Sequence, residues 1–208
     1  MRKIPRETIS RLSASLTALL YLPEEKSNIS SFELANITGS NPNQLRKDLS
    51  YFGKFGRRGI GYSVKELIDN LKNILGMNKT WNVALCGLGN LGKALASYKG
   101  FSQQGLIIRV ILEKDSKKIG KKFAGIDVLS IDQIRQAAKK HRINIAVLAV
   151  PVDQAQSIAE EIYKAGVRAI LNFAPLNLNI GPGCFVRNVY MSSDLTYLTY
   201  SLGQRGRT

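Results

Sequence analysis

The sequence predicts an α/β protein with an N-terminal winged helix-turn-helix domain and a C-terminal Rossmann domain, whose parallel sheet is doubly wound. Short helical segments separated by polar breaks fill the first part of the chain. After residue 80, apolar strands alternate with helices, and a glycine-rich turn follows the first of these strands. We therefore assign residues 1–78 to the first domain, 79–190 to the second, and 191–208 to a C-terminal helix and tail.

The charge balance points to a polyanionic partner. The chain has 208 residues, and 30 Lys and Arg against 15 Asp and Glu give a net charge of +15. Such an excess favours nucleic acid or an anionic membrane surface. No apolar run approaches the roughly 18 residues needed to span a bilayer, and two cysteines, Cys86 and Cys184, are too few for a disulfide framework. We expect a cytoplasmic protein without a membrane partner.

The first domain is expected to begin with a helix that starts at Pro5. Three- and four-residue spacing places five apolar side chains on one face of this helix, namely Ile9, Leu12, Leu16, Leu19 and Leu20.

A helix-turn-helix follows. Ser30 and Glu33 have the spacing of a capping box at the start of a second helix, which ends near Gly39. A third helix is predicted from Asn43 to Phe52, and two short helices separated by about four residues form a helix-turn-helix pattern.

Residues 54–62 contain too many glycines for a helix and predict a two-stranded wing, before helical spacing returns over residues 64–75.

The third helix and the wing carry side chains suited to reading duplex DNA. Asn43 and Gln44 can pair with adenine edges and Arg46 with guanine, while Lys47 and Ser50 can contact phosphates. Arg57 and Arg58 on the wing can enter a narrow minor groove. The candidate DNA-binding residues are Ser31, Asn43, Gln44, Arg46, Lys47, Ser50, Tyr51, Lys54, Phe55, Arg57, Arg58, Gly59 and Tyr62.

The second domain opens with an apolar strand over residues 81–86 and the turn Gly87-Leu88-Gly89-Asn90-Leu91-Gly92. In a dinucleotide-binding turn, Gly87 permits the tight bend, Gly89 lets backbone amides approach a pyrophosphate, and Gly92 lets the next helix pack closely. That helix presents unpaired N–H groups and its positive dipole end to the phosphates. Further strands are expected at 106–112, 145–150 and 169–173, and helices at 131–141 and 154–165.

Glu113 ends the next strand, where a carboxylate can accept hydrogen bonds from an adenosine ribose. A 2′-phosphate would face a like charge there, which favours NAD(H) over NADP(H). Five lysines in the next segment, Lys114, Lys117, Lys118, Lys121 and Lys122, leave NADP(H) open, although a solvated basic face is the simpler interpretation. The candidate cofactor-binding residues are Gly87, Leu88, Gly89, Asn90, Leu91, Gly92, Tyr98, Glu113, Lys114, Val150, Pro151, Asn172, Phe173 and Ala174.

Several motifs closely resemble those of the Rex family of redox-sensing transcriptional repressors. They are Ser30 to Ala35, Gln44 to Tyr62, Gly87 to Gly92, Tyr98 to Phe101, Val150-Pro151 and Ile170 to Pro175. The resemblance covers nearly the whole chain. It implies a homodimer that binds a palindromic operator and leaves it when NADH binds, so that NAD(H) is an effector and not a catalytic cofactor.

By the same resemblance, Tyr98 lies on the nicotinamide side, and the C-terminal helix with Leu195, Leu198 and Leu202 is swapped onto the partner subunit. Packing on its own domain is the alternative for this helix.

Two positions depart from the family pattern. Thr17 replaces an arginine of the first helix, and Tyr190 replaces an aspartate before the last helix. In the family, these two groups are expected to form a state-dependent ion pair, so one alternative is a repressor with a weakened or altered redox response. Another is a repressor whose Rossmann domain only dimerises or senses a different nucleotide.

An NAD-dependent dehydrogenase is the least favoured alternative. It would need a proton donor near the substrate, and the single histidine, His141, lies in a basic helix end. The sequence therefore predicts neither catalytic nor metal-binding residues, and no enzyme.

Overall fold

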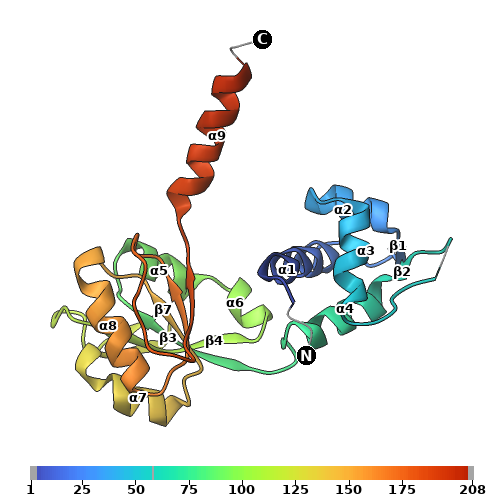
Figure 1. The fold of residues 1–208 in the computed structure, drawn as a ribbon. Helices are drawn as coiled ribbons and strands as arrows, with labels where there is room; N and C mark the ends of the chain where they lie inside the picture. Colours follow the sequence, from blue (N-terminus) through green and yellow to red (C-terminus); the bar gives the residue numbers. More distant parts are fainter. Residues whose placement is uncertain (1–3, 58, 206–208) are drawn as a thin grey trace. The chain divides into compact units, whose positions relative to one another are not determined.

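The computed structural model describes residues 4–57 and 59–205. It divides into two compact units, a first unit of residues 1–79 and a second unit of residues 80–208 (Figure 1). Each unit has its own hydrophobic core. Arg58, which the sequence assigns to the wing, lies outside the described residues.

The first unit is mainly helical. Its elements are α1 (Arg6–Leu20), β1 (Asn28–Ile29), α2 (Ser31–Thr38), α3 (Pro42–Ser50), β2 (Tyr62–Ser63) and α4 (Val64–Ile74). Leucines from all four helices fill its core, with Leu12, Leu34, Leu45 and Leu71 almost completely buried. The three helices α1, α2 and α3 pack on one another, which gives the predicted helix-turn-helix its support.

The buried stripe of α1 is narrower than predicted. Leu12, Leu16 and Leu19 are buried, but Ile9 and Leu20 are 39% and 45% exposed. The predicted face spanned too wide an arc, so its two outermost residues remain at the surface of this unit.

The wing also differs from the prediction. Among the described residues of the wing, a bridge between Arg57 and Gly61 closes the loop, and the two-stranded sheet instead pairs β2 with the distant β1 in antiparallel register. Gly61 has φ +90°, and a Cβ there would lie 2.6 Å from the Ile29 carbonyl oxygen. The close passage of this backbone past β1 therefore requires glycine.

The second unit has the predicted Rossmann architecture. Its strands are β3 (Trp81–Cys86), β4 (Leu106–Glu113), β5 (Lys122–Phe123), β6 (Ile126–Ser130), β7 (Ile145–Leu148), β8 (Ala169–Asn172) and β9 (Phe185–Asn188). Its helices are α5 (Asn90–Ser97), α6 (Gly100–Gln103), α7 (Ile134–His141), α8 (Val152–Lys164) and α9 (Met191–Arg205), with a 3-10 turn at Ile131–Gln133.

The sheet order is β5-β6-β4-β3-β7-β8-β9, and every pair is parallel except β5 with β6. The sequence did not predict β5, β6 and β9, which lie toward the sheet edges and lack a continuous apolar run.

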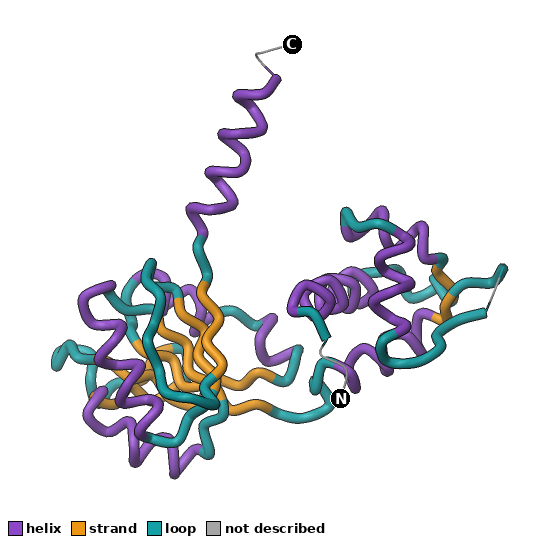
Figure 2. Tube along the Cα trace, viewed as in Figure 1, coloured by secondary structure: helices purple, strands orange, loops and turns teal. Residues whose placement is uncertain are grey.

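Side chains of β3 alternate between the two faces of the sheet. Ala84 and Cys86 join the core beneath α7 and α8, whereas Val83 and Leu85 join the core on the α5 side. Figure 2 shows the strands between these helical layers. The chain leaves β3 for β4 on one side and later returns to β7 on the other, so the strand order reverses beside β3. In such sheets, the carboxyl ends at this reversal form a ligand crevice.

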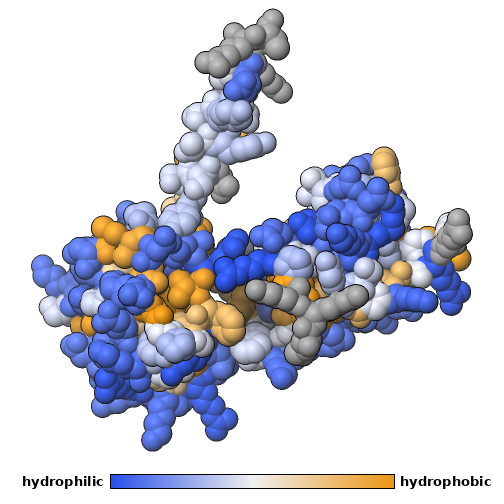
Figure 3. Space-filling view, in the orientation of Figure 1, coloured by the Kyte–Doolittle hydropathy of each residue, from blue (hydrophilic) through white to orange (hydrophobic). Residues whose placement is uncertain are grey.

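Helix α9 buries none of its apolar side chains within the chain. Leu195, Leu198 and Leu202 are 65%, 55% and 68% exposed. Apolar residues also gather on part of the second unit below α9 in Figure 3. An apolar cavity of about 230 Å³ lies on the α5 face of the sheet, lined by Val83, Leu85, Leu95, Phe101, Leu106, Ile108, Ile145, Val147 and Leu171.

Candidate dinucleotide cleft and DNA-binding surface

A cleft of about 330 Å³ opens at the carboxyl edge of the second unit's sheet, where the strand order reverses. We call it the dinucleotide cleft. It is lined by Gly87, Leu88, Gly89, Leu112, Glu113, Lys114, Asp115, Lys118, Ile131, Ala149, Val150, Pro151, Gln154 and Ile158. The turn after β3, the end of β4 and the turn after β7 thus meet at one site.

The three glycines of the turn have different surroundings. Gly87 has φ +95°, and a Cβ there would lie 2.4 Å from the Ala149 carbonyl oxygen. A Cβ on Gly92 would lie 2.0 Å from the Gly87 carbonyl oxygen, whereas a Cβ on Gly89 would meet nothing within 4 Å. Gly87 and Gly92 therefore permit close packing of the protein with itself, and Gly89 keeps the cleft open.

The cleft fits an anionic group at the start of α5. No side chain caps this helix, whose N-cap residue is Gly89, so its first N–H groups are available to an anion. Helix α8 begins after Pro151 at the same cleft and has no side-chain cap either. The N–H groups of Gly87 and Leu88 already donate to the Leu112 carbonyl oxygen and to Glu113, so a pyrophosphate would be held by the backbone N–H groups at the start of α5.

Glu113 lines the cleft, but its carboxylate oxygens already accept hydrogen bonds from other groups of the protein. Oε2 accepts hydrogen bonds from the Leu88 backbone N–H at 2.8 Å and from Lys118 Nζ at 3.3 Å. Oε1 accepts from the backbone N–H groups of Lys114 at 2.8 Å and Asp115 at 3.2 Å. Burial raises the pKa of Glu113, but these hydrogen bonds outweigh it and hold the pKa below its ordinary value.

Seven of the sequence-predicted cofactor residues line the cleft, namely Gly87, Leu88, Gly89, Glu113, Lys114, Val150 and Pro151. The cleft lining does not include Asn90, Leu91, Gly92, Tyr98, Asn172, Phe173 or Ala174. Tyr98 is 56% exposed and packs edge-on against Phe101, with ring centroids 5.1 Å apart.

Asn172 is buried at the end of β8. Its amide nitrogen donates to the carbonyl oxygens of Ala174 and Leu176 and to Asn188 Oδ1, each at 3.0 Å. In this structure, Asn172 therefore organises the loop after β8.

Six lining residues were not singled out from the sequence, namely Leu112, Asp115, Ile131, Ala149, Gln154 and Ile158, and Lys118 was named only among the five lysines that leave NADP(H) open. Asp115 had a usable signal, because it closely follows the acidic residue that ends β4. The others come from separate strands and helices, which only the fold brings together.

In the first unit, a cavity of about 460 Å³ lies between the helix-turn-helix and the wing. We call it the wing groove. It is lined by Ser30, Ser31, Arg46, Phe55, Gly56, Arg57, Gly59, Ile60, Gly61 and Tyr62. Arg46 donates to Ser31 Oγ at 2.5 Å and also contacts Asn43 Oδ1, which holds its guanidinium at the exposed surface.

Side-chain caps fix both helices of the helix-turn-helix. The Ser30 backbone N–H donates to Glu33 Oε2 at 2.8 Å, and the Glu33 N–H donates to Ser30 Oγ at 3.1 Å, which completes the predicted capping box. Hydrogen bonds from Lys26 and Ser30 lower the pKa of Glu33 to about 2. At the start of α3, Asn41 Oδ1 accepts from the Asn43 N–H at 2.8 Å.

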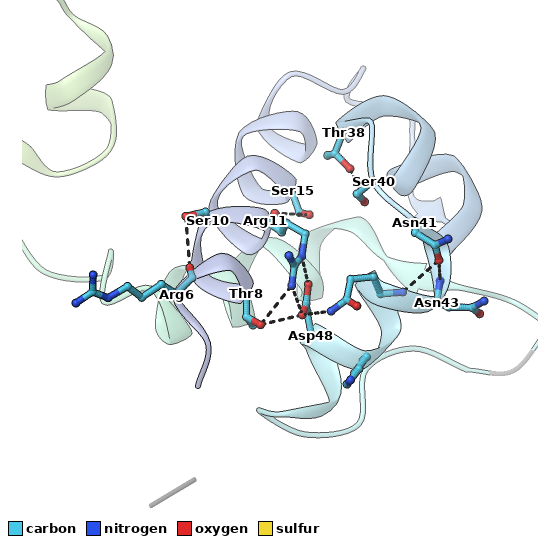
Figure 4. A network of polar contacts seen from close by, with 12 residues as sticks. Arg6, Thr8, Ser10, Arg11, Ser15, Thr38, Ser40, Asn41, Asn43 and Asp48 are labelled. Carbon is cyan, nitrogen blue, oxygen red and sulfur yellow. Dashed lines mark hydrogen bonds and ion pairs between the residues drawn. The ribbon is translucent and has the colours of Figure 1, made fainter. Parts of the chain in front are cut away.

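A buried carboxylate ties α3 to α1 (Figure 4). Asp48 is 0% exposed and accepts from Arg11 Nε at 2.6 Å, from Arg11 Nη2 at 2.9 Å, from Thr8 Oγ1 at 2.9 Å and from Gln44 Nε2 at 2.9 Å. Burial raises the pKa of Asp48, but the hydrogen bonds from Arg11, Gln44 and Thr8 outweigh it and lower the pKa below its ordinary value.

The Asp48 network revises the prediction for Gln44. Its side-chain amide donates to a buried carboxylate and is therefore not directed at a base edge in this structure. Tyr62 also differs from the prediction, since only 8% of it is exposed and it belongs to the core beneath the wing groove. Burial raises the pKa of Tyr62.

The remaining candidates of α3 and the wing lie at or near the surface. Lys47, Ser50, Lys54, Arg57 and Gly59 are exposed, while Tyr51 and Phe55 are half-buried. The Ser50 hydroxyl donates to the Lys47 carbonyl oxygen at 2.7 Å.

Neither position that departs from the family pattern carries a charge. The Thr17 hydroxyl donates to the Ser13 carbonyl oxygen at 3.2 Å within α1, and the Tyr190 hydroxyl donates to Asn177 Oδ1 at 2.8 Å. Both side chains therefore have local partners in their own units.

Over residues 4–57 and 59–205, no group of three or more His, Cys, Asp or Glu side chains is arranged to hold a metal ion. In this described part, no helix has the length and apolar character required to cross a membrane.

Both units match known family models. Residues 3–50 match a model described as a putative DNA-binding protein N-terminus, and residues 78–176 match a CoA binding domain. The redox-sensing transcriptional repressor Rex of Desulfitobacterium hafniense is 45% identical over 98% of this chain and 97% of its own length. The repressor Rex 1 of Thermotoga maritima is 39% identical over 98% of each chain.

Solved structures agree with these relatives. A crystal structure of RSP in complex with β-NAD+ and operator DNA matches with a TM-score of 0.90 and 33% identity, covering 99% of this chain and 95% of that one. RSP in complex with β-NADH matches with a TM-score of 0.89 and 32% identity, covering 99% and 97%. These findings confirm the predicted fold class and favour neither the dehydrogenase nor a repressor with an altered redox response.

Proposed function

The chain belongs to the Rex family of redox-sensing transcriptional repressors, and we propose that it is a homodimeric repressor that binds a palindromic operator and leaves it when NADH binds. The relatives of this chain carry the name of redox-sensing repressors, and the RSP structures contain NAD+ with operator DNA or NADH. We propose NAD(H) as the effector here as well, bound in the dinucleotide cleft and not consumed.

One observation carries the proposal. A single chain combines a capped helix-turn-helix, whose Arg46 lies at the wing groove, with an open glycine turn at the strand reversal of a Rossmann sheet. Duplex DNA and a dinucleotide are the ligands these two features suit. The net charge of +15 supports the DNA partner.

Dimerisation is supported by the apolar surface of the second unit. Leu195, Leu198 and Leu202 remain more than half exposed on α9, and exposed apolar helices are typical of interaction surfaces. We propose that α9 is swapped onto the partner subunit, and that dimerisation couples the dinucleotide cleft to operator binding. We also propose a cytoplasmic location, because the operator lies there.

A gel shift on a palindromic, A·T-rich duplex tests the proposal. The operator affinity should fall with increasing salt by about 0.9 log unit per log unit of salt for each phosphate contact. Titration with NADH should release the duplex at a lower concentration than NAD+ does. An unaltered complex at saturating NADH, verified by calorimetry on the same sample, would reject redox sensing and retain only DNA binding.

A pair of α3 variants separates base recognition from phosphate contact. Arg46→Ala should weaken operator binding by about 10- to 100-fold and relax selectivity at one base pair, since a bidentate arginine contributes roughly 1–3 kcal/mol of discrimination. Lys47→Ala should weaken operator and random duplexes alike and lower the salt slope by about one phosphate. Fluorescence anisotropy on both duplexes measures these effects. Equal losses of Arg46→Ala on both duplexes would contradict a base contact.

A further inference from the structure

The carboxylate of Glu113 has no acceptor position left for a ribose. A carboxylate offers about four lone-pair positions, and Glu113 receives four hydrogen bonds. Three come from the backbone N–H groups of Leu88, Lys114 and Asp115, which are fixed by the turn after β3 and by the loop after β4. The fourth comes from Lys118. Only this donor can leave without moving the backbone.

The position of the Lys118 ammonium allows it to leave Glu113 and to pair with another anionic group in the cleft. The ammonium lies 3.3 Å from Glu113 Oε2 and 3.5 Å from Asp115 Oδ2, and the Lys118 side chain is 35% exposed against 11% for Glu113. The ammonium therefore stands on the solvent side of the buried carboxylate. It also lines the dinucleotide cleft.

The charged side chains that line the cleft have a net charge of zero. Glu113 and Asp115 contribute two negative charges, and Lys114 and Lys118 contribute two positive charges. An acidic residue at this position normally disfavours a 2′-phosphate because like charges repel. Here a cation 3.3 Å away offsets the carboxylate.

We propose that Lys118 determines how the dinucleotide cleft selects between NAD(H) and NADP(H). Lys118 donates a hydrogen bond to Glu113 and thereby competes with the free hydroxyls of an NAD(H) ribose. A ribose hydroxyl must displace the Lys118 ammonium before it can donate to Glu113. For NADP(H), Lys118 turns to the 2′-phosphate, while the three backbone N–H groups continue to satisfy Glu113. The inference rests on the proposed dinucleotide site.

Lys118→Met tests it, because methionine keeps the alkyl stem and removes the charge. Calorimetry with NADH and NADPH should show NADPH affinity reduced by about tenfold or more, as expected for the loss of one charge-assisted hydrogen bond. NADH affinity should rise. The ratio of the two dissociation constants therefore shifts by more than tenfold toward NADH.

Lys121→Met is the matched control. Lys121 lies in the same loop, is exposed, and has no ion pair over the described residues. For Lys121→Met, the ratio of the NADH and NADPH dissociation constants should stay within about twofold of the ratio of the unmodified protein, because exposed charges at a distance are screened. Melting curves check that both variants fold.

The outcomes separate this inference from the proposed function. If the unmodified protein binds NADH and Lys118→Met leaves the ratio unchanged, the assignment of Lys118 is overturned and the proposed function stands. The same holds if Lys121→Met shifts the ratio equally, since the effect is then one of net charge. If the unmodified protein binds neither dinucleotide, both are overturned.

Discussion

Gly89→Ala is expected to lower the affinity for NADH by roughly 100-fold while leaving the melting temperature unchanged. A Cβ at this position meets no protein atom within 4 Å, and the backbone at Gly89, with φ −76° and ψ −167°, is accessible to alanine. The methyl group would project toward the cleft and keep a pyrophosphate from the N–H groups of α5. Losing one or two hydrogen bonds to charged oxygens, at about 1.5–3 kcal/mol each, gives this magnitude. Calorimetry and a melting curve measure the two quantities.

Gly92→Ala provides the contrast within the same turn. A Cβ there would lie 2.0 Å from the Gly87 carbonyl oxygen, so α5 must move away from the turn. Both the melting temperature and the NADH affinity should fall. If Gly89→Ala bound NADH with the affinity of the unmodified protein, the pyrophosphate would not lie against Gly89 and this assignment would be refuted.

Arg11→Met is expected to destabilise the first unit by about 3–5 kcal/mol, because it leaves the Asp48 carboxylate buried without its countercharge. Asp48 is 0% exposed, and Arg11 supplies two of its hydrogen bonds, at 2.6 and 2.9 Å. Loss of the pair frees α3 from α1, so operator affinity should fall as well. Amide hydrogen exchange localised to α3 measures the local free energy of opening.

Arg6→Met is the matched control, because Arg6 lies on the same helix and is exposed (Figure 4). Its effect should stay within about 0.5 kcal/mol. Equal protection of α3 in the two variants would show that the buried pair does not hold the helix.

The same pair predicts how stability depends on pH. The pKa of Asp48 is lower in the folded chain than its ordinary value, so its contribution is complete above the unfolded pKa of about 3.9 and is lost as the pH falls through the folded pKa. The unfolding free energy of the unmodified protein should therefore fall as the pH drops below about 4, which denaturant unfolding at a series of pH values measures.

Much of the candidate site was predictable because its signals are local. Ser30 and Glu33 have capping-box spacing, and the structure forms both hydrogen bonds. The glycine turn follows an apolar strand and precedes a helix, and the structure places it at the cleft. Each of these features is specified within about ten residues, where sequence spacing fixes spatial proximity.

The side-chain partners were not predictable in the same way. Gln44 has the chemistry of a base reader, yet it donates to Asp48, a buried carboxylate of α3 that also accepts hydrogen bonds from Thr8 and Arg11 of α1. Glu113 has the position of a ribose acceptor, yet Leu88, 25 residues earlier, and Lys118 occupy it. Polar groups form whichever hydrogen bonds the folded chain brings within reach, and burial makes those bonds costly to leave unmade.

The sequence by itself therefore determined the two units, the helix-turn-helix, the Rossmann sheet and the glycine turn, because hydrophobic periodicity, caps and glycines act through near neighbours. Only the tertiary structure decided the pairing of β2 with β1, the pairing of the edge strand β9 with β8, and the ion pair that holds α3. It also decided the hydrogen bond from the Leu88 N–H to Glu113. These features depend on contacts between residues far apart in the chain, and their energies arise only when several segments are buried together.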